Sequence, residues 1–212
     1  MRASAPASFQ PRGRNGAGPA RRVRGVTLLE VLVTLAVILI VSAMALPLTD
    51  RMRQEGKVRG AAYAMATRCG WLRIASVHRG ARVAMRLTEA GSSWTAQSFI
   101  DGDWDGVRSA DIASGRDPAI DQPLDVRQWG VEFGFATGCP LVDGSTVPAG
   151  ASPVRLGTSR MLVFTPDGAS SGGSLYLRGP TGTAAYAVVI LAATGRSRLL
   201  RCAAGSTTWI EQ

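Results

Sequence analysis

The chain contains one long apolar block, which runs from Val26 to Leu48 and carries a single charged residue, Glu30. At about 1.5 Å per residue, a helix of this length measures roughly 34 Å, enough to cross the hydrocarbon core of a bilayer. The block is too long for the apolar core of a secretory signal peptide, which has about 7 to 15 residues. The sequence therefore predicts a transmembrane helix over residues 26–48.

The net charge of +9 is concentrated before this block. Residues 1–25 contain no acidic residue and six arginines, namely Arg2, Arg12, Arg14, Arg21, Arg22 and Arg24. The positive-inside rule therefore places residues 1–25 in the cytoplasm and the rest of the chain across the membrane. Without these six arginines the formal charge is +3, so a nucleic-acid site would have to be a local cluster.

Glu30 is unusual because a carboxylate at the centre of a membrane helix costs about 2.5 to 3.5 kcal/mol on insertion scales, and less toward the ends. Such a residue either reaches back to the interface or has a partner. Gly25 followed by Val26-Thr27-Leu28-Leu29-Glu30 resembles the type III signal of type IV pilins and type II secretion pseudopilins.

The resemblance implies that prepilin peptidase cuts after Gly25 and that the new N-terminal residue, Val26, is methylated. It further implies that Glu30 pairs with the N-terminal amine of a neighbouring subunit, and that Pro47 kinks the helix. Val26 departs from the phenylalanine that is usual in major pilins. The implied location is the bacterial inner membrane, crossed once, with a periplasmic domain that becomes extracellular when it is assembled in a pilus.

Beyond the block, apolar and small residues recur at the spacing of one helical face, namely at Val58, Ala62, Met65, Cys69, Leu72 and Ser76. This stripe predicts a periplasmic helix over residues 49–80 that packs on a sheet. Gly80 is expected to end the helix.

Residues 81–212 form the expected β-rich globular domain. Residues alternate with a period of two around Val83 and around Phe133, and short apolar runs follow at Met161–Phe164, Ser174–Arg178, Ala185–Ala193 and Arg196–Ala203. The polar, turn-rich segment from Gly102 to Pro123 is interpreted as a long loop. A long helix followed by many short strands predicts an α+β fold in which antiparallel sheet packs on the helix.

Within the pilin superfamily, this domain resembles the GspH/FimT group of minor pseudopilins and minor pilins. Three segments carry the resemblance: Trp94–Ile100 with the acidic loop Asp101–Gly106, Phe164–Gly168 with Gly173–Leu177, and Val188–Arg198. The implied fold is the type IV pilin fold.

The sequence offers little for catalysis. His78 is the only histidine, and no Gly-x-Ser-x-Gly elbow or phosphate-binding loop is present. We therefore expect no enzymatic activity, and calcium is the one cofactor that the sequence leaves open. Asp101, Asp103 and Asp105 imitate the first half of a calcium loop with glycine at the sixth position, although Ile112 replaces the glutamate at the twelfth.

The three cysteines allow one disulfide and leave one thiol in an oxidising periplasm. Because Cys69 belongs to the apolar helical stripe, a buried thiol is expected there. Cys139 and Cys202 are then the preferred bridge.

Two functions remain open, and both use prepilin peptidase and other pilin or pseudopilin subunits as partners. One is a structural subunit near the tip of a type II secretion pseudopilus, without DNA binding. The other is a FimT-like minor pilin that captures double-stranded DNA, because Gly195-Arg196-Ser197-Arg198 matches the Gly-Arg-x-Arg motif associated with DNA binding in such pilins.

Residues two apart on a strand point the same way, so the side chains of Arg196 and Arg198 could meet adjacent phosphates. Arg201 and Arg178 are expected to widen this basic patch. The alternative is that these arginines bind no ligand and only keep an exposed edge strand in contact with water.

Overall fold

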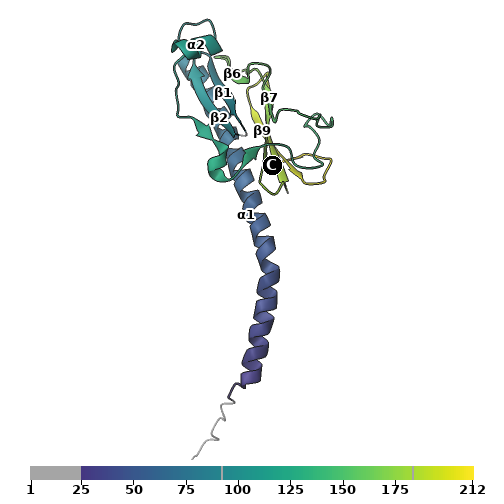
Figure 1. The fold of residues 1–212 in the computed structure, drawn as a ribbon. Helices are drawn as coiled ribbons and strands as arrows, with labels where there is room; N and C mark the ends of the chain where they lie inside the picture. The colour runs from purple at the N-terminus through teal and green to yellow at the C-terminus, as the bar shows by residue number, and fades with distance from the viewer. Residues whose placement is uncertain (1–24, 92, 183) are drawn as a thin grey trace, which may run out of the picture. The chain divides into compact units, whose positions relative to one another are not determined.

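The structure is a computed structural model that describes residues 25–91, 93–182 and 184–212, without the side chains of residues 44–49 and 51. It confirms the expected α+β class, with a long helix and antiparallel sheets (Figure 1). The chain divides into two compact units, with the boundary between Ala45 and Leu46.

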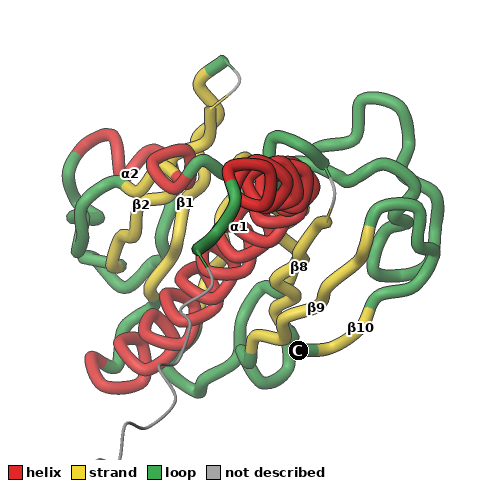
Figure 2. The backbone as a smooth tube through the Cα atoms, turned by 90° about the horizontal axis from the view of Figure 1, so that it is seen from below, coloured by secondary structure: helices red, strands yellow, loops and turns green. Residues whose placement is uncertain are grey.

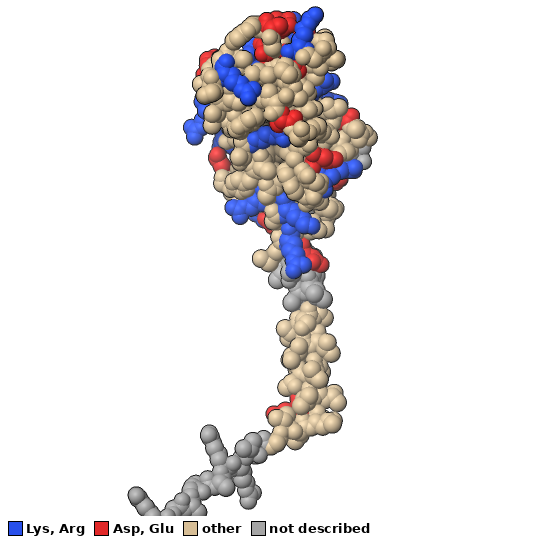
Figure 3. Space-filling view, turned by 90° about the vertical axis from the view of Figure 1, so that its left-hand side faces the viewer, with Lys and Arg blue, Asp and Glu red and all other residues tan. Residues whose placement is uncertain are grey.

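The helix α1 (Leu28–Arg79) begins in the first unit, directly after Thr27. Its apolar side chains there are largely exposed, from 46% for Val31 to 81% for Leu28. In Figure 3 the described part of this segment is almost uniformly uncharged. No helix in the described part of the chain is long and apolar enough to span a bilayer. Residues 1–24 of the expected leader and the side chains of residues 44–48 in the expected span lie outside the described residues.

In the second unit, α1 buries the stripe that the sequence predicted. All six residues of the stripe are at most 2% exposed, from Val58 to Ser76. The helix ends at Arg79, and Gly80 follows in the left-handed region with φ +63°. The Gly80 N–H donates to the carbonyl oxygen of Val77 at 3.3 Å, which caps the last turn.

The first sheet has the strand order β3-β2-β1-β6. A hairpin of β1 (Val83–Ala90) and β2 (Ser93–Ile100) pairs in antiparallel register along its full length, with β3 (Leu124–Asp125) and β6 (Met161–Phe164) at the edges. Five alternate residues of the hairpin share a core cluster with the buried face of α1, namely Val83, Met85, Leu87, Trp94 and Ala96.

The second sheet has the order β10-β9-β8-β7-β4, and β5 (Val154–Arg155) also pairs with β7. Its strands are β4 (Glu132–Phe133), β7 (Gly173–Arg178), β8 (Ala184–Ile190), β9 (Ser197–Ala203) and β10 (Ile210–Glu211). Figure 2 shows β1 and β2 on one side of α1 and β8, β9 and β10 on the other. One core cluster joins the buried face of α1 to residues of both sheets.

The outer face of the second sheet is also buried. Tyr176, Ala187 and Leu200 lie beneath the segment that follows β4, and Trp209 packs against them. The hydroxyl of Tyr176 accepts the N–H of Val142 at 3.0 Å. Burial on both faces explains why β8 reads as a nearly continuous apolar run rather than an alternating one.

The structure differs from the sequence-based expectation in three places. The expected loop over Gly102–Pro123 contains a short helix, α2 (Ser109–Ser114), which is too short to show a helical period. The alternation around Phe133 yields only the two residues of β4, and the 3-10 helix η1 (Val126–Trp129) precedes this strand. The run from Ala185 to Ala193 leaves the sheet after Ile190, because the chain turns there toward β9.

Candidate functional sites

The predicted processing and assembly residues lie at the start of α1. Gly25 and Val26 are exposed, and nothing lies within 4 Å of a Cβ built at Gly25. The Glu30 backbone N–H donates to Thr27 Oγ1 at 3.2 Å, so Thr27 and Glu30 have the spacing of a capping box. Glu30 thus has a local role that the sequence analysis missed, in the first helical turn where a carboxylate favours the helix dipole. The Pro47 side chain lies outside the described residues.

The Gly-Arg-x-Arg segment forms the turn between β8 and β9. Gly195 has φ +60°, and a Cβ added there would lie 2.5 Å from the carbonyl oxygen of Gly168. The turn is closed by the Gly195 N–H, which donates to Leu191 at 2.8 Å, and by the Leu191 N–H, which donates to Arg196 at 2.9 Å. Only glycine fits this position without strain, and Arg196 extends from the turn as an exposed side chain.

Arg198 is exposed but paired. Its Nε donates to Glu211 Oε1 on the adjacent strand β10 at 2.9 Å, and its Nη2 contacts the second oxygen of the same carboxylate. The pKa of Glu211 is lowered, because its carboxylate accepts these hydrogen bonds. The same hydrogen bonds raise the pKa of Arg198. A phosphate would have to displace Glu211 from this two-point contact.

Arg201 does not widen the patch, which corrects the expectation. Arg198 and Arg201 are three residues apart on one strand, so they point to opposite faces of the sheet. Arg201 turns toward α1, where its Nε donates to Glu55 at 2.6 Å. That hydrogen bond is the main cause of the raised pKa of Arg201.

Arg178 is also separated from the motif. It lies on the same outer face as Arg198, but the register places it opposite Ala185, which pairs with Cys202. This is four residues along the strands from the level of Arg198, or about 13 Å. Its Nε donates to Glu132 at 2.8 Å. Of the four arginines expected in the patch, Arg196 and Arg198 remain the predicted pair, and both are exposed.

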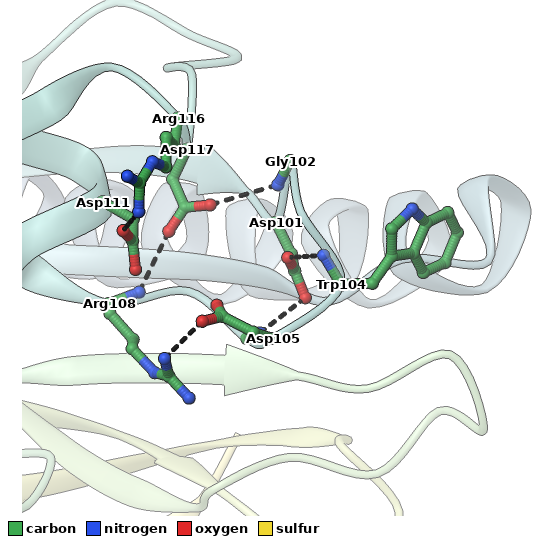
Figure 4. A network of polar contacts seen from close by, with 9 residues as sticks. Asp101, Gly102, Trp104, Asp105, Arg108, Asp111, Arg116 and Asp117 are labelled. Atoms are coloured by element: carbon green, nitrogen blue, oxygen red, sulfur yellow. Dashed lines mark hydrogen bonds and ion pairs between the residues drawn. The ribbon is translucent and has the colours of Figure 1, made fainter.

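The acidic loop after β2 does bring its carboxylates together. Asp101, Asp103 and Asp105 each offer an oxygen within 4.8 Å of the others. Asp101 is buried, and its two oxygens accept the N–H of Trp104 at 2.7 Å and the N–H of Gly106 at 2.9 Å (Figure 4). Asp101 thereby shapes the loop, while Asp103 and Asp105 are exposed.

The base of the same loop is held by Asp117, which is 1% exposed and accepts the N–H groups of Gly102 at 3.1 Å and Arg108 at 3.0 Å. The pKa of Asp105 is raised, first by desolvation and then by Asp103, while the Arg108 guanidinium opposes the shift. Asp111, the carboxylate next to Ile112 at the twelfth position, pairs with Arg116 at 3.2 Å.

Calcium binding stays a prediction. Calorimetric titration of the purified chain with calcium tests it, and a flat trace would contradict it.

Cys139 and Cys202, the pair preferred from the sequence, are joined by a disulfide in the structure. The bridge ties the segment after β4 to β9 and lies in a small buried cluster with Ala136 and Ala185. Cys69 is a free thiol in the core. Burial raises the pKa of Cys69 to about 12, so the thiol is protonated at neutral pH.

Sequence reasoning missed one interaction that joins α1 to the first sheet. Arg68 donates to Asp121 at 2.5 Å, and both side chains are mostly buried, at 15% and 21% exposed. Asp121 also accepts the N–H of Ser98 at 2.8 Å. No spacing rule links residues 53 positions apart, so only the folded structure shows this pair.

His78 is exposed near the end of α1. Within the described residues it makes no hydrogen bond.

Comparison with known families finds one match, the prokaryotic N-terminal methylation motif, over residues 20–46. This span contains the predicted cleavage site at Gly25 and Val26 as well as Glu30, so the chain carries a prepilin-type N-terminal motif. No curated protein and no solved structure matches the chain.

Proposed function

We propose that this chain is a minor pilin or pseudopilin subunit that is cleaved after Gly25, methylated at Val26 and assembled through its N-terminal helix. The observation that carries the proposal is the methylation motif over residues 20–46. A protein with this motif is a substrate of prepilin peptidase, is anchored in the inner membrane and joins other subunits of its kind. Such subunits are structural and not enzymatic.

The exposed apolar surface at the start of α1 supports assembly. Val26, Leu28, Leu29 and Leu32 are between 59% and 81% exposed, so this surface must be covered by lipid or by the helices of neighbouring subunits. Glu30 is the only charge in this surface. In a bundle of such helices, a neighbouring N-terminal amine would satisfy the carboxylate in surroundings of low dielectric constant.

The test uses two variants expressed with the native assembly system. Gly25→Leu should keep the 25-residue leader, because the peptidase must accommodate the residue before the cut. Glu30→Gln, which removes the charge at almost constant shape, should still be cleaved and methylated but enter filaments poorly. Mass spectrometry of membrane-derived protein and quantification of sheared filaments measure both effects. A mature N-terminus other than methylated Val26 contradicts the proposal.

The finer assignment we propose is a GspH/FimT-type subunit at or near the filament tip. It is supported by the three resembling segments, which lie in β2 with the acidic loop, in β6 with β7, and in β8 with β9. Genes next to the coding sequence discriminate the two systems: a secretin-secretion cluster favours a type II pseudopilus, and a pilus and competence cluster favours a type IV pilus.

DNA binding by Arg196 and Arg198 is the second candidate, favoured by the exposed turn that presents Arg196. Three variants test it in gel-shift assays at several salt concentrations. Arg196→Ala with Arg198→Ala should abolish the shift, while Glu211→Gln should strengthen it because Arg198 loses its competing partner. Arg178→Ala is the matched control, since it lies at the other end of the strands. Equal DNA affinity in all variants contradicts a role for Arg196 and Arg198, and the absence of a shift with the unmodified chain supports the secretion-tip subunit without DNA binding.

A further inference from the structure

Positive charge is concentrated in the turns of α1 that follow the expected span. Residues 50–59 hold four basic residues and two acidic ones, and Arg53, Lys57 and Arg59 are exposed. The positive-inside rule concentrates Lys and Arg on the cytoplasmic side of a membrane helix, so basic residues on the far side work against it. The arginines of the expected leader already set the orientation of the anchor. Orientation therefore does not explain the basic residues after the span.

These three cations lack a carboxylate partner among the described residues, whereas seven other arginines have one. The guanidinium carbon of Arg59 lies 5.5 Å from the ring centroid of Tyr63, a contact that leaves its charge unmatched. Glu55 lies nearby in the chain, but Arg201 Nε already donates to it at 2.6 Å. The three cations therefore keep their positive charge available for a ligand.

Helix geometry directs these side chains toward the anchor. In an α-helix every Cα–Cβ bond tilts toward the N-terminus, which for α1 is the end that carries the expected span. At about 1.5 Å per residue, Arg53, Lys57 and Arg59 lie roughly 8, 14 and 17 Å beyond Leu48 along the helix axis. The headgroup layer adds about 5 to 7 Å on each side of the hydrocarbon core. Arg53 reaches this layer directly, and the long side chains of the other two extend back toward it.

The three charges are distributed around the helix. Arg53 and Lys57 are four residues apart and share one face, while Arg59 lies about 240° around the axis from Arg53. In Figure 3, Lys and Arg side chains gather at the lower end of the second unit. A partner protein docked on one side of α1 would meet only some of these charges. A membrane surface surrounds the helix and meets all of them.

We infer that Arg53, Lys57 and Arg59 form a basic collar that binds anionic phospholipid headgroups at the outer surface of the inner membrane. The inference rests on the proposed function, because the anchor of a prepilin-type protein supplies this surface. Basic residues next to a membrane helix attract anionic lipids through their charge, and the attraction falls off within a Debye length. The collar holds the subunit at a fixed depth before assembly, and its lipid contacts are lost when the subunit enters a filament.

The test is electron paramagnetic resonance of the full chain in phosphatidylcholine vesicles that contain a trace of spin-labelled lipid. The motionally restricted fraction of the label measures the selectivity of the chain for spin-labelled phosphatidylglycerol over spin-labelled phosphatidylcholine. The collar variant is Arg53→Gln with Lys57→Gln and Arg59→Gln. The matched control removes the same charge from three other exposed arginines that lack an ion pair among the described residues, namely Arg79→Gln, Arg82→Gln and Arg155→Gln.

The unmodified chain should prefer phosphatidylglycerol. The collar variant should lower this selectivity at least about threefold at low salt, and the control variant should leave it unchanged. In about 1 M salt, where the Debye length is about 3 Å, the unmodified chain and the collar variant should become similar. All variants carry the same leader arginines, so the difference between them reports the collar alone. Thermal melting confirms that each variant is folded.

The inference is overturned if the collar variant keeps the selectivity of the unmodified chain, or if the control variant loses as much. Unchanged lipid selectivity together with poor entry into filaments would assign the three cations to a neighbouring subunit instead. Cleavage after Gly25 and methylation of Val26 do not involve the collar, and mass spectrometry measures them separately. Failure here therefore leaves the proposed function standing.

Discussion

Removing the Cys139–Cys202 disulfide should destabilise the globular unit strongly. The bridge closes a loop with a sequence separation of 63 residues. For a loop of that length, the chain-entropy relation gives about 14 cal/mol/K, or about 4 kcal/mol at 25 °C, of stabilisation through the unfolded state. The packing loss in Cys139→Ala with Cys202→Ala is small, because both positions lie in a cluster with Ala136 and Ala185. We therefore expect a loss of about 3 to 4 kcal/mol.

The assay is guanidinium chloride unfolding of the detergent-solubilised chain, followed by tryptophan fluorescence. Reduction of the wild-type protein should lower the free energy of unfolding as much as the double variant does, and the double variant should not respond to reductant. Cys69→Ala is the control for losing a buried sulfur without losing a bridge, and we expect a cost of about 1 kcal/mol. A loss below about 1 kcal/mol in the double variant would refute the reasoning, as would a Cys69 bridge found by peptide mapping without reductant.

Three further predictions follow from the fold. Gly195→Ala should lower the free energy of unfolding by about 2 kcal/mol or more, because the new Cβ would lie 2.5 Å from a backbone oxygen and φ is positive. Gly182 also has a positive φ but open space around it, so Gly182→Ala should cost about half as much in the same unfolding assay. Arg68→Met should cost about 2 to 3 kcal/mol by leaving the Asp121 carboxylate unpaired, and a double-mutant cycle with Asp121→Asn should show a coupling above about 1 kcal/mol. The pKa of the Cys69 thiol is raised to about 12 in the folded state, against about 8.5 in the unfolded state, so the free energy of unfolding should fall as pH rises through this window. Thiol reagents should modify Cys69 only when the protein unfolds. Modification of the native protein at neutral pH would contradict this prediction.

Local periodicity was enough to predict the central helix. The stripe from Val58 to Ser76 is buried because a period of 3.6 places its members on one face, whatever the sheet they meet. The same kind of argument predicted the cores of β6, β7 and β9. It failed for α2, because the one buried residue among its six is Asp111 and the helix has no buried apolar face.

The candidate sites depend more on pairing between distant segments, which a sequence pattern does not encode. The period of two predicts that Arg196 and Arg198 point the same way, yet it should also have excluded Arg201 from the face of Arg198. It carries no information on Glu211, which reaches Arg198 because β10 pairs with β9. Nor does it place Glu55 opposite Arg201, which requires β9 to lie against α1. The charges of a motif can be read from the sequence, while their neutralisation cannot.

Whether a side chain already has an ion-pair partner within the chain therefore determines how it can take part in assembly. Arg178, Arg198 and Arg201 are each matched by a carboxylate within the chain, so a ligand would have to compete with an existing ion pair. The apolar surface that surrounds Glu30 is a different case, because its side chains are exposed in the described residues. Lipid or the helices of neighbouring subunits can cover this surface without displacing an ion pair. Glu30→Gln should therefore lower entry of this subunit into filaments.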